Sequence, residues 1–235
     1  DATHLGGRHA VDFLRRASGR HHVLPDLNVS RDVAEAAGRL AVTVAEQLRL
    51  AARLLSLRTV SSTGWRGVIL GLAAARRAAT LVRQSIAWTI HRAINDGAAQ
   101  VADHYGAHGM WVTEPDACVL CLAYAGRLAD RDGRFPGGLS TDPRTRSASL
   151  AAIDGPPRHI NCRCRLVPWM PYWDTGPGTL PDLLRDQALR SIATGAARPS
   201  ESRAARRRAA QALLAQRGLS ARVRRQAQAT AAGRS

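Results

Sequence analysis

The segments Cys118-Val119-Leu120-Cys121 and Arg158-His159-Ile160-Asn161-Cys162-Arg163-Cys164 contain all four cysteines of this 235-residue chain. A zinc ion in a protein takes four ligands in a tetrahedron, commonly cysteine and histidine side chains paired at short spacing. The residues between the segments are rich in Gly, Pro and Asp, which form turns but no core. A metal ion would stabilise such a region. We therefore expect a structural zinc site that takes four of five candidate ligands: Cys118, Cys121, His159, Cys162 and Cys164.

Other states of the four cysteines remain open from the sequence. They could form two disulfides or remain free thiols, although no secretory signal is visible. The short spacings within both pairs favour a metal. Alternation along an extended segment would place Cys162 and Cys164 on one side and Arg163 on the other. No open coordination position and no His-x-Glu motif is evident, so the expected role is structural rather than catalytic.

The rest of the chain predicts a mainly α protein. Ser30 is a good N-cap for a helix to about Leu57, whose apolar residues recur every three or four positions. A second periodic stretch continues to Tyr105 and predicts a long antiparallel hairpin with a turn at 58–64. Residues 95–97 could kink it. A short strand is expected at 111–113. The expected regions are a loosely structured lead-in (1–29), the long helical hairpin (30–110), a small zinc-stapled loop/β knob (111–175) and a basic helical C-terminal arm (176–235).

Charge is concentrated at the C-terminus. The net charge is +16, all basic residues are Arg, and residues 198–235 hold ten Arg against the single acid Glu201, a net +9. An all-Arg composition also fits a GC-rich genome. The segment reads either as a solvated, partly disordered tail or as an arm that contacts DNA phosphates or an acidic partner. No apolar run is long enough to span a membrane. The arginines proposed to make those contacts are Arg203, Arg206, Arg207, Arg208, Arg217, Arg222, Arg224 and Arg225.

One block of residues resembles the phage Mu protein F-like (MuF) minor head proteins. The resemblance covers roughly residues 65–168, and its most specific part is the string Pro156-Pro157-Arg158-His159-Ile160-Asn161-Cys162-Arg163-Cys164. The chain departs from the family at Gln84-Ser85, where members have Thr-Glu, and at Ile160, where they have Pro. The other matching residues are Trp111, Asp116, Cys118, Cys121, Gly126 and Pro168.

The resemblance implies a virion component of low copy number that acts in head morphogenesis. It implies a place inside the phage head, partners that include the portal, other head proteins and packaged double-stranded DNA, and the host cytoplasm during assembly. Some members are proposed to be ejected with the DNA. The first residue, Asp1, is not Met, which fits a processed product or a fragment.

Two enzyme readings and one regulatory reading are alternatives. In an HNH-type nuclease a zinc-stapled fold presents a catalytic His, and the chain offers His91, His104 and His108 near Asp96 and Asp103. It lacks paired carboxylates, a nucleophile elbow and a phosphate loop, so we expect no enzyme activity. The second enzyme reading is a toxin domain behind the MuF-like block, but the segment that follows the block is short for a folded toxin domain. A zinc-containing nucleic-acid-binding regulator is the third alternative.

Overall fold

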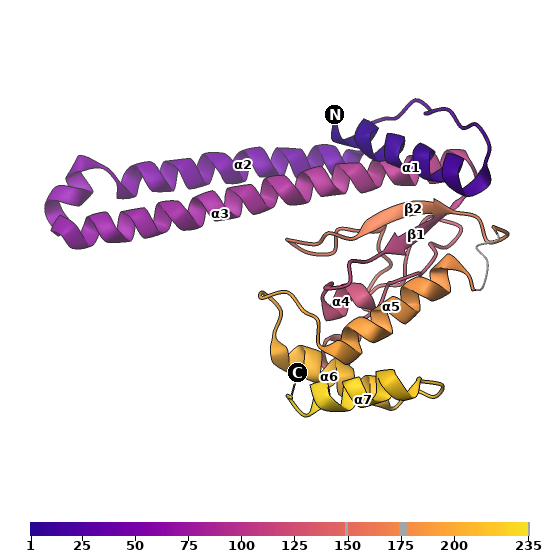
Figure 1. The fold of residues 1–235 in the computed structure, drawn as a ribbon. Coiled ribbons are helices and arrows are strands. Elements are labelled where there is room, and N and C mark those ends of the chain that lie inside the picture. Colours follow the sequence, from indigo (N-terminus) through magenta and orange to yellow (C-terminus); the bar gives the residue numbers. More distant parts are fainter. Residues whose placement is uncertain (149, 174–177, 235) are drawn as a thin grey trace.

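The computed structural model describes residues 1–148, 150–173 and 178–234, and it is mainly helical (Figure 1). The predicted fold class is confirmed: a long helical hairpin is followed by a small two-stranded sheet with a Cys/His cluster and then by C-terminal helices. The predicted boundary at 175/176 lies outside the described residues. The elements are α1 (Ala2–Ser18), α2 (Arg31–Leu54), α3 (Leu57–His104), β1 (His108–Val112), α4 (Val119–Leu122), the 3-10 helix η1 (Pro143–Thr145), β2 (Arg165–Trp169), α5 (Leu180–Thr194), α6 (Arg203–Leu214) and α7 (Ala221–Ala231).

The hairpin of α2 and α3 projects well beyond the rest of the molecule (Figure 1). As predicted, Ser30 caps α2: its hydroxyl accepts the amide of Val33. Ser56 caps the start of α3 just before the predicted turn, and the break in the helix at Gly64 falls within the predicted 58–64 segment. The only non-helical residue in α3 is Gly64, with φ 58° and ψ −150°, so the expected kink at 95–97 is absent.

The prediction of a loosely structured lead-in is wrong for its first half, which forms α1. Asp1 caps this helix, and Gly19 ends it with φ 66°. Gly6 of α1 and Gly97 of α3 allow a close crossing: a Cβ at Gly6 would lie 1.9 Å from the carbonyl oxygen of Ile94, and one at Gly97 would lie 2.0 Å from that of Thr3. The sequence signal was missed because small residues rather than large apolar ones make this contact.

The two-stranded sheet lies at the centre of the body, which is the part of the molecule that follows α3. β1 pairs antiparallel with β2 and starts three residues before the predicted strand, with Met110 opposite Val167 and Trp111 opposite Leu166. The fully buried Trp111 ring stacks on Tyr124 at 4.5 Å and meets Phe135 edge-on at 5.2 Å. This aromatic cluster packs Tyr124 and Phe135, from the segment that follows β1, against that strand.

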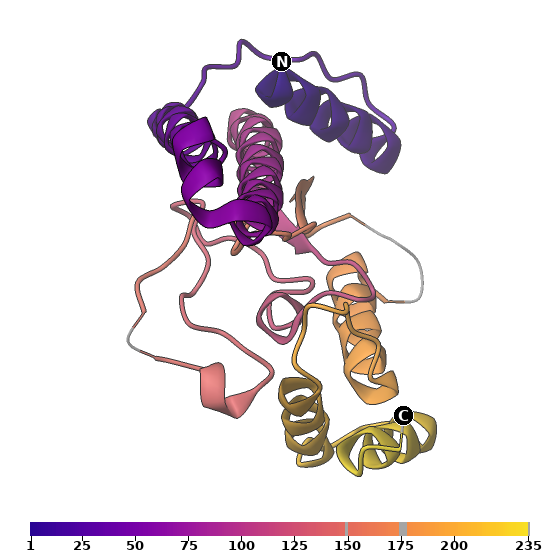
Figure 2. The same cartoon turned by 90° about the vertical axis from the view of Figure 1, so that its left-hand side faces the viewer.

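The C-terminal third is folded onto the body rather than extended from it. Thr179 and Ser220 cap α5 and α7 as predicted, and α6 ends at Leu214. The hydroxyl of Thr230 in α7 donates to the carbonyl of Ala193 at 2.7 Å, and Ala209, Ala210, Leu213 and Ala227 are buried. Figure 2 shows α6 and α7 at the end of the molecule opposite α1. The expected partly disordered tail is therefore an ordered, packed unit within residues 178–234.

No helix in the described part of the chain is both long and apolar enough to cross a bilayer.

Candidate metal centre

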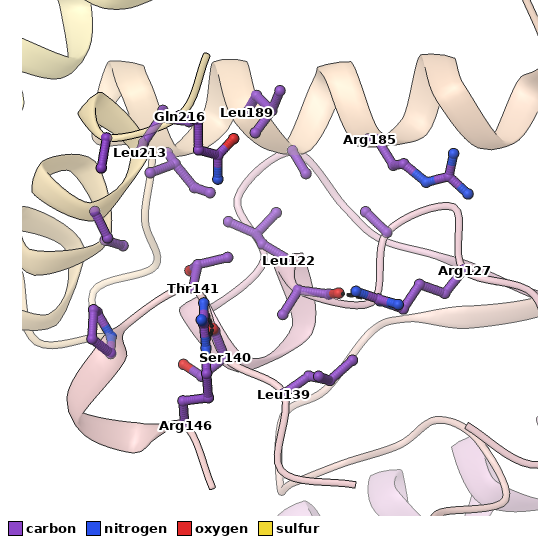
Figure 3. Close-up of a pocket in the computed structure, with 18 residues that line it drawn as sticks. Leu122, Arg127, Leu139, Ser140, Thr141, Arg146, Arg185, Leu189, Leu213 and Gln216 are labelled. Atoms are coloured by element: carbon purple, nitrogen blue, oxygen red, sulfur yellow. Dashed lines mark hydrogen bonds between the residues drawn. The ribbon is translucent and has the colours of Figure 1, made fainter. Parts of the chain in front are cut away.

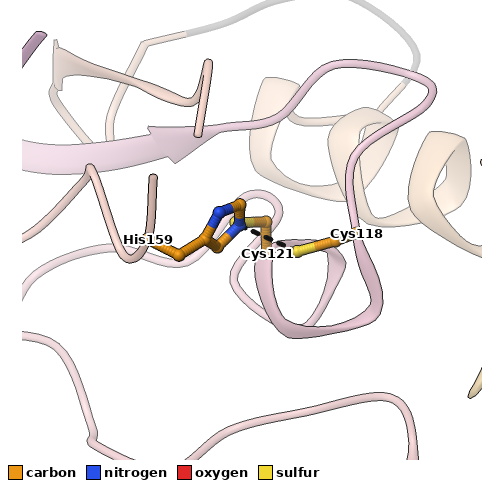
Figure 4. A group of neighbouring side chains, drawn as sticks. All are labelled: Cys118, Cys121 and His159. Atoms are coloured by element: carbon orange, nitrogen blue, oxygen red, sulfur yellow. Dashed lines mark hydrogen bonds between the residues drawn. The ribbon is translucent and has the colours of Figure 1, made fainter. Parts of the chain in front are cut away.

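The two cysteine segments converge beside the sheet. Cys118 is the N-cap residue of the short helix α4 and Cys121 lies within it, so one helical turn brings both thiols to one side (Figure 4). On the other segment, the amide of Cys162 donates to the carbonyl of His159 at 3.0 Å and closes a turn. Asn161 within this turn has φ 67°, a conformation that Asn tolerates better than most residues. Cys164 follows directly before β2.

The five predicted ligands form one cluster centred on Cys121. His159 Nε2 lies 3.0 Å from the sulfur of Cys118 and 3.4 Å from that of Cys121, and the sulfurs of Cys121 and Cys162 are 3.7 Å apart. Two overlapping groups have all their ligand atoms within 4.8 Å of one another, and Cys121 belongs to both. No disulfide joins these cysteines. The cluster can therefore hold a metal ion, with ligands drawn from Cys118, Cys121, His159, Cys162 and Cys164.

The orientation of His159 is that of a metal ligand. Its Nδ1 lies 2.6 Å from the carbonyl oxygen of Ile160, a contact that places the ring proton on Nδ1 in the neutral tautomer. Nε2 then turns its lone pair toward the sulfurs. Histidines that bind metals commonly donate their second ring N–H to a carbonyl in this way.

The electrostatic interactions inside the cluster favour a bound cation. The pKa of Cys121 is raised because its thiol faces the sulfurs of Cys118, Cys162 and Cys164 and is buried. The pKa of Cys118 is lowered to about 4, first by its contact with Cys121 and also by that with His159. The same contact with Cys118 raises the pKa of His159 to about 9. Sulfurs this close cannot all ionise unless a cation compensates them.

Trp111 adds an independent observation. Its indole Nε1 is buried and has no nitrogen or oxygen acceptor among the described residues, which is costly for an N–H group. The neighbouring Cys164 has a pKa raised to about 12: contact with Cys121 lowers it, contact with Cys162 and burial raise it, and the Trp111 indole lowers it. A metal ion that ionised the sulfurs of the cluster would give this indole N–H an acceptor.

Ion pairs and hydrogen bonds from charged side chains stabilise residues 116–119, at the start of α4. The carboxylate of Asp116 binds the guanidinium groups of Arg163 and Arg198. Glu201 accepts the amide of Val119 at 2.6 Å and pairs with Arg206, whose guanidinium also donates to the carbonyl of Ala117 at 2.7 Å. The side chains of Arg206 and Glu201 are only 3% and 6% exposed. The sequence alone does not reveal the buried pairing of Arg206 with Glu201, because a count of charges does not distinguish Arg206 from its neighbours.

This burial corrects the predicted set of arginines that contact nucleic acid. Arg206 is inaccessible, and Arg208 is bound to Asp142, whose side chain is fully buried; the Arg208 guanidinium lowers the pKa of that carboxyl. The other six are exposed, and within the described residues no acidic side chain pairs with them. They are Arg203, Arg207, Arg217, Arg222, Arg224 and Arg225.

The residues considered for a nuclease are not among the metal-type groups of the described residues. His104 packs against the ring of Tyr105, and His108 Nδ1 lies 3.1 Å from the carbonyl of Ala129. Asp96 accepts a hydrogen bond from Gln100 within its own helix. Among the described residues, the metal-type groups involve only the four cysteines and His159.

A large cavity of the described structure lacks His, Cys, Asp and Glu side chains. It has a volume of about 800 Å³ and lies between α5, α6 and the loop 139–146 (Figure 3). Arg127, Arg146 and Arg185 line it, and each donates to a backbone carbonyl. Its other lining residues are apolar or uncharged, with no His, Cys, Asp or Glu. The cavity can hold an anionic or apolar group, but it carries no acid, base or nucleophile pair.

Comparison of the chain with protein-family models, with curated proteins and with solved structures gives no significant match.

Proposed function

We propose that the cluster is a structural zinc site with Cys118, Cys121, His159 and Cys162 as its ligands. Zn–S and Zn–N bonds of about 2.3 and 2.0 Å give a tetrahedron with S···S edges of about 3.8 Å and S···N edges of about 3.5 Å. The Cys121–Cys162 and Cys121–His159 separations of 3.7 and 3.4 Å fit these edges, whereas the Cys118–His159 separation of 3.0 Å is shorter than its edge. Thiolate and imidazole ligands in a tetrahedron favour zinc among the common divalent metals. Cys164 is left to accept the indole N–H of Trp111.

Metal analysis of single variants tests this ligand set. We expect about one zinc per wild-type chain, close to one in Cys164→Ser, and a large loss in Cys162→Ser. Of these two residues, only Cys162 belongs to the proposed ligand set. The two variants make the same atomic change two residues apart. A wild type with less than about half an equivalent contradicts a zinc site, whereas loss in Cys164→Ser with retention in Cys162→Ser contradicts the ligand set alone.

For the protein as a whole, we propose a MuF-like minor capsid role in a tailed phage: a structural protein inside the head that associates with the portal and with packaged DNA. The observation that carries this proposal is that the two halves of the motif, Cys118–Cys121 and Pro156–Cys164, converge on one cluster. Trp111, the third part of the motif, packs beside it. A cavity of about 340 Å³ adjoins the cluster, so the convergence of the motif, and not a lack of space, is what supports a structural role over the nuclease alternative.

The exposed arginines of α6 and α7 support contact with DNA. The six side chains lie on a unit whose acidic residue, Glu201, is already used by Arg206, so their charge is available to phosphates. Each neutralised phosphate releases counterions, which makes binding depend on salt. Because α6 and α7 pack on the body, deletion of this unit would expose core residues, and Arg→Gln changes at the six positions are the cleaner test. An unchanged salt slope of DNA retention would contradict the contact.

The location of the chain in purified particles tests the role directly. We expect density for the hairpin and body inside the head next to the portal, at low copy number. Absence of the chain from mature particles and from proheads would contradict the proposal. Cleavage of plasmid DNA in the presence of Mg²⁺ by the metal-loaded protein would instead favour the nuclease alternative.

A further inference from the structure

The outer part of the hairpin exposes apolar side chains in a regular row. Trp65 is 81% exposed, and Ile69, Leu72, Ile86 and Ile90 are between 40% and 64% exposed. All five lie on α3 after the break at Gly64, in a stretch of continuous helix. Single exposed apolar residues are common on protein surfaces, but two groups on one helix face, Trp65–Leu72 and Ile86–Ile90, indicate an interaction site.

The row has the spacing of a coiled-coil seam. The positions step by 4, 3, 4, 3, 4, 3 and 4 residues, and every one of them is exposed. Such a heptad repeat keeps one face of a helix toward a partner helix over its whole length, about 38 Å for these residues. We refer to the row as the α3 seam: Trp65, Ile69, Leu72, Arg76, Ala79, Arg83, Ile86 and Ile90.

The α3 seam does not face α2. The buried side of this part of α3 is formed by Gly67, Gly71 and Ala78, none of which belongs to the seam. At 100° per residue these three positions are turned well away from the centre of the seam, by roughly 110–140°. The hairpin therefore uses one side of α3 internally and leaves the seam open.

The charge around the seam specifies the partner. From Gln47 to Asn95 the chain has eight arginines and no acidic residue, and Arg76 and Arg83 lie within the seam itself. A second copy of the same hairpin would bring arginines together without any acid to pair with them, which disfavours self-association. A membrane surface would meet both guanidinium groups in the middle of the apolar row. A helix with acidic residues opposite Arg76 and Arg83 satisfies both the apolar and the charged positions.

We propose that the α3 seam is a docking surface for an acidic amphipathic helix of another protein, packed along Trp65–Ile90 as a third helix on the hairpin. Its apolar residues fill the seam positions, and its carboxylates pair with Arg76 and Arg83. This inference stands apart from the zinc site and from the proposed phage role, since it rests only on the exposure, spacing and charge of the hairpin.

The test uses the full chain and a designed helical peptide of four heptads. The acidic form carries Leu and Ile at its seam positions with Glu opposite Arg76 and Arg83, and the matched form carries Lys in place of Glu. Titration calorimetry should show binding of the acidic peptide that is at least about tenfold tighter than that of the Lys peptide. Equal binding of the two peptides, or binding of neither, overturns the proposal.

Two pairs of uncharged substitutions locate the contact. Ile69→Gln with Ile86→Gln changes the seam, whereas Leu70→Gln with Leu81→Gln changes exposed leucines about 160° around α3. The seam pair should weaken the acidic peptide at least about tenfold, and the control pair by less than about twofold. Equal losses in the two pairs overturn the proposal. Circular dichroism of each variant checks that the hairpin remains helical.

Charge reversal and two competing occupants complete the experiment. Arg76→Glu with Arg83→Glu should reverse the preference from the Glu peptide to the Lys peptide, which a general loss of folding cannot do. Vesicles of phosphatidylcholine and phosphatidylglycerol in a 3:1 ratio, and light scattering of the protein alone, test the other occupants. Seam-dependent vesicle binding without peptide binding overturns the proposal in favour of a membrane, and a wild-type dimer that Ile69→Gln with Ile86→Gln dissociates overturns it in favour of a second copy.

Discussion

Trp111 in the body and Trp65 on the hairpin show how differently the two regions of this molecule are built. Trp111 is fully buried between Tyr124, Phe135 and the cysteine cluster, whereas Trp65 is 81% exposed. In the body, the large apolar side chains pack within the chain, although a few buried polar atoms such as Trp111 Nε1 lack a hydrogen-bond partner. In the hairpin, the α3 seam has no partner within the described chain. The body is thus stabilised by contacts within the chain, whereas the exposed face of the hairpin is the surface that we propose binds a partner helix.

The strongest test of this contrast is removal of the proposed zinc ion. We expect chelation, or Cys121→Ser, to unfold the body around the cluster, because structural zinc supplies apparent binding free energies of about 10–16 kcal/mol in small domains. The indole NMR signal of Trp111, one of five tryptophans, should shift to that of an exposed indole. Far-UV circular dichroism should keep most of the helical signal, since α2 and α3 do not depend on the cluster. An unchanged Trp111 environment in the metal-free protein would contradict a stabilising metal.

A smaller loss of stability is expected at the buried ion pair of Arg206 and Glu201, which connects α6 to α4. Arg206→Met leaves the carboxylate of Glu201 buried without its cation, and loss of one partner of a buried pair costs about 3–5 kcal/mol. The free energy of unfolding of the body, measured with denaturant, should fall by this amount. The neighbouring Arg207→Met, at an exposed position, is the control and should change it by less than about 0.5 kcal/mol. Equal effects would mean that burial of Arg206 contributes no stability.

These contacts also show what the sequence can and cannot predict. Helix caps such as Ser30, Thr179 and Ser220 act locally, and the cysteine spacings define a metal cluster without reference to the rest of the fold, so both were predictable. Arg206 and Arg208 were assigned to a DNA-binding arm, because a count of charges does not record that Glu201 and Asp142 lie opposite them in space. Helix α1 was missed for a similar reason, since its packing at Thr3 depends on Gly97, more than ninety positions away along the chain.

The glycine contact between α1 and α3 gives a further test. Gly97→Ala places a Cβ 2.0 Å from the carbonyl oxygen of Thr3, so α1 must move, and overpacking of this kind costs about 1–3 kcal/mol. Gly38→Ala in α2 meets no atom within 4 Å and should instead raise stability by about 0.5–1 kcal/mol through helix propensity. Thermal unfolding of the two variants should therefore move in opposite directions. Parallel shifts would mean that α1 does not pack against Gly97.

The smallest expected effect lies on the α3 seam, and it sharpens the comparison most. Ile69→Gln removes an apolar side chain of the size that would cost several kcal/mol in the body, but Ile69 is 64% exposed. The free energy of unfolding of the isolated chain should change by less than about 0.5 kcal/mol, while binding of the acidic peptide falls by about tenfold, or about 1.4 kcal/mol. A seam that serves the fold would show the reverse, with a loss of stability and unchanged binding. The separation of these two quantities distinguishes a surface kept for a partner from an ordinary part of the core.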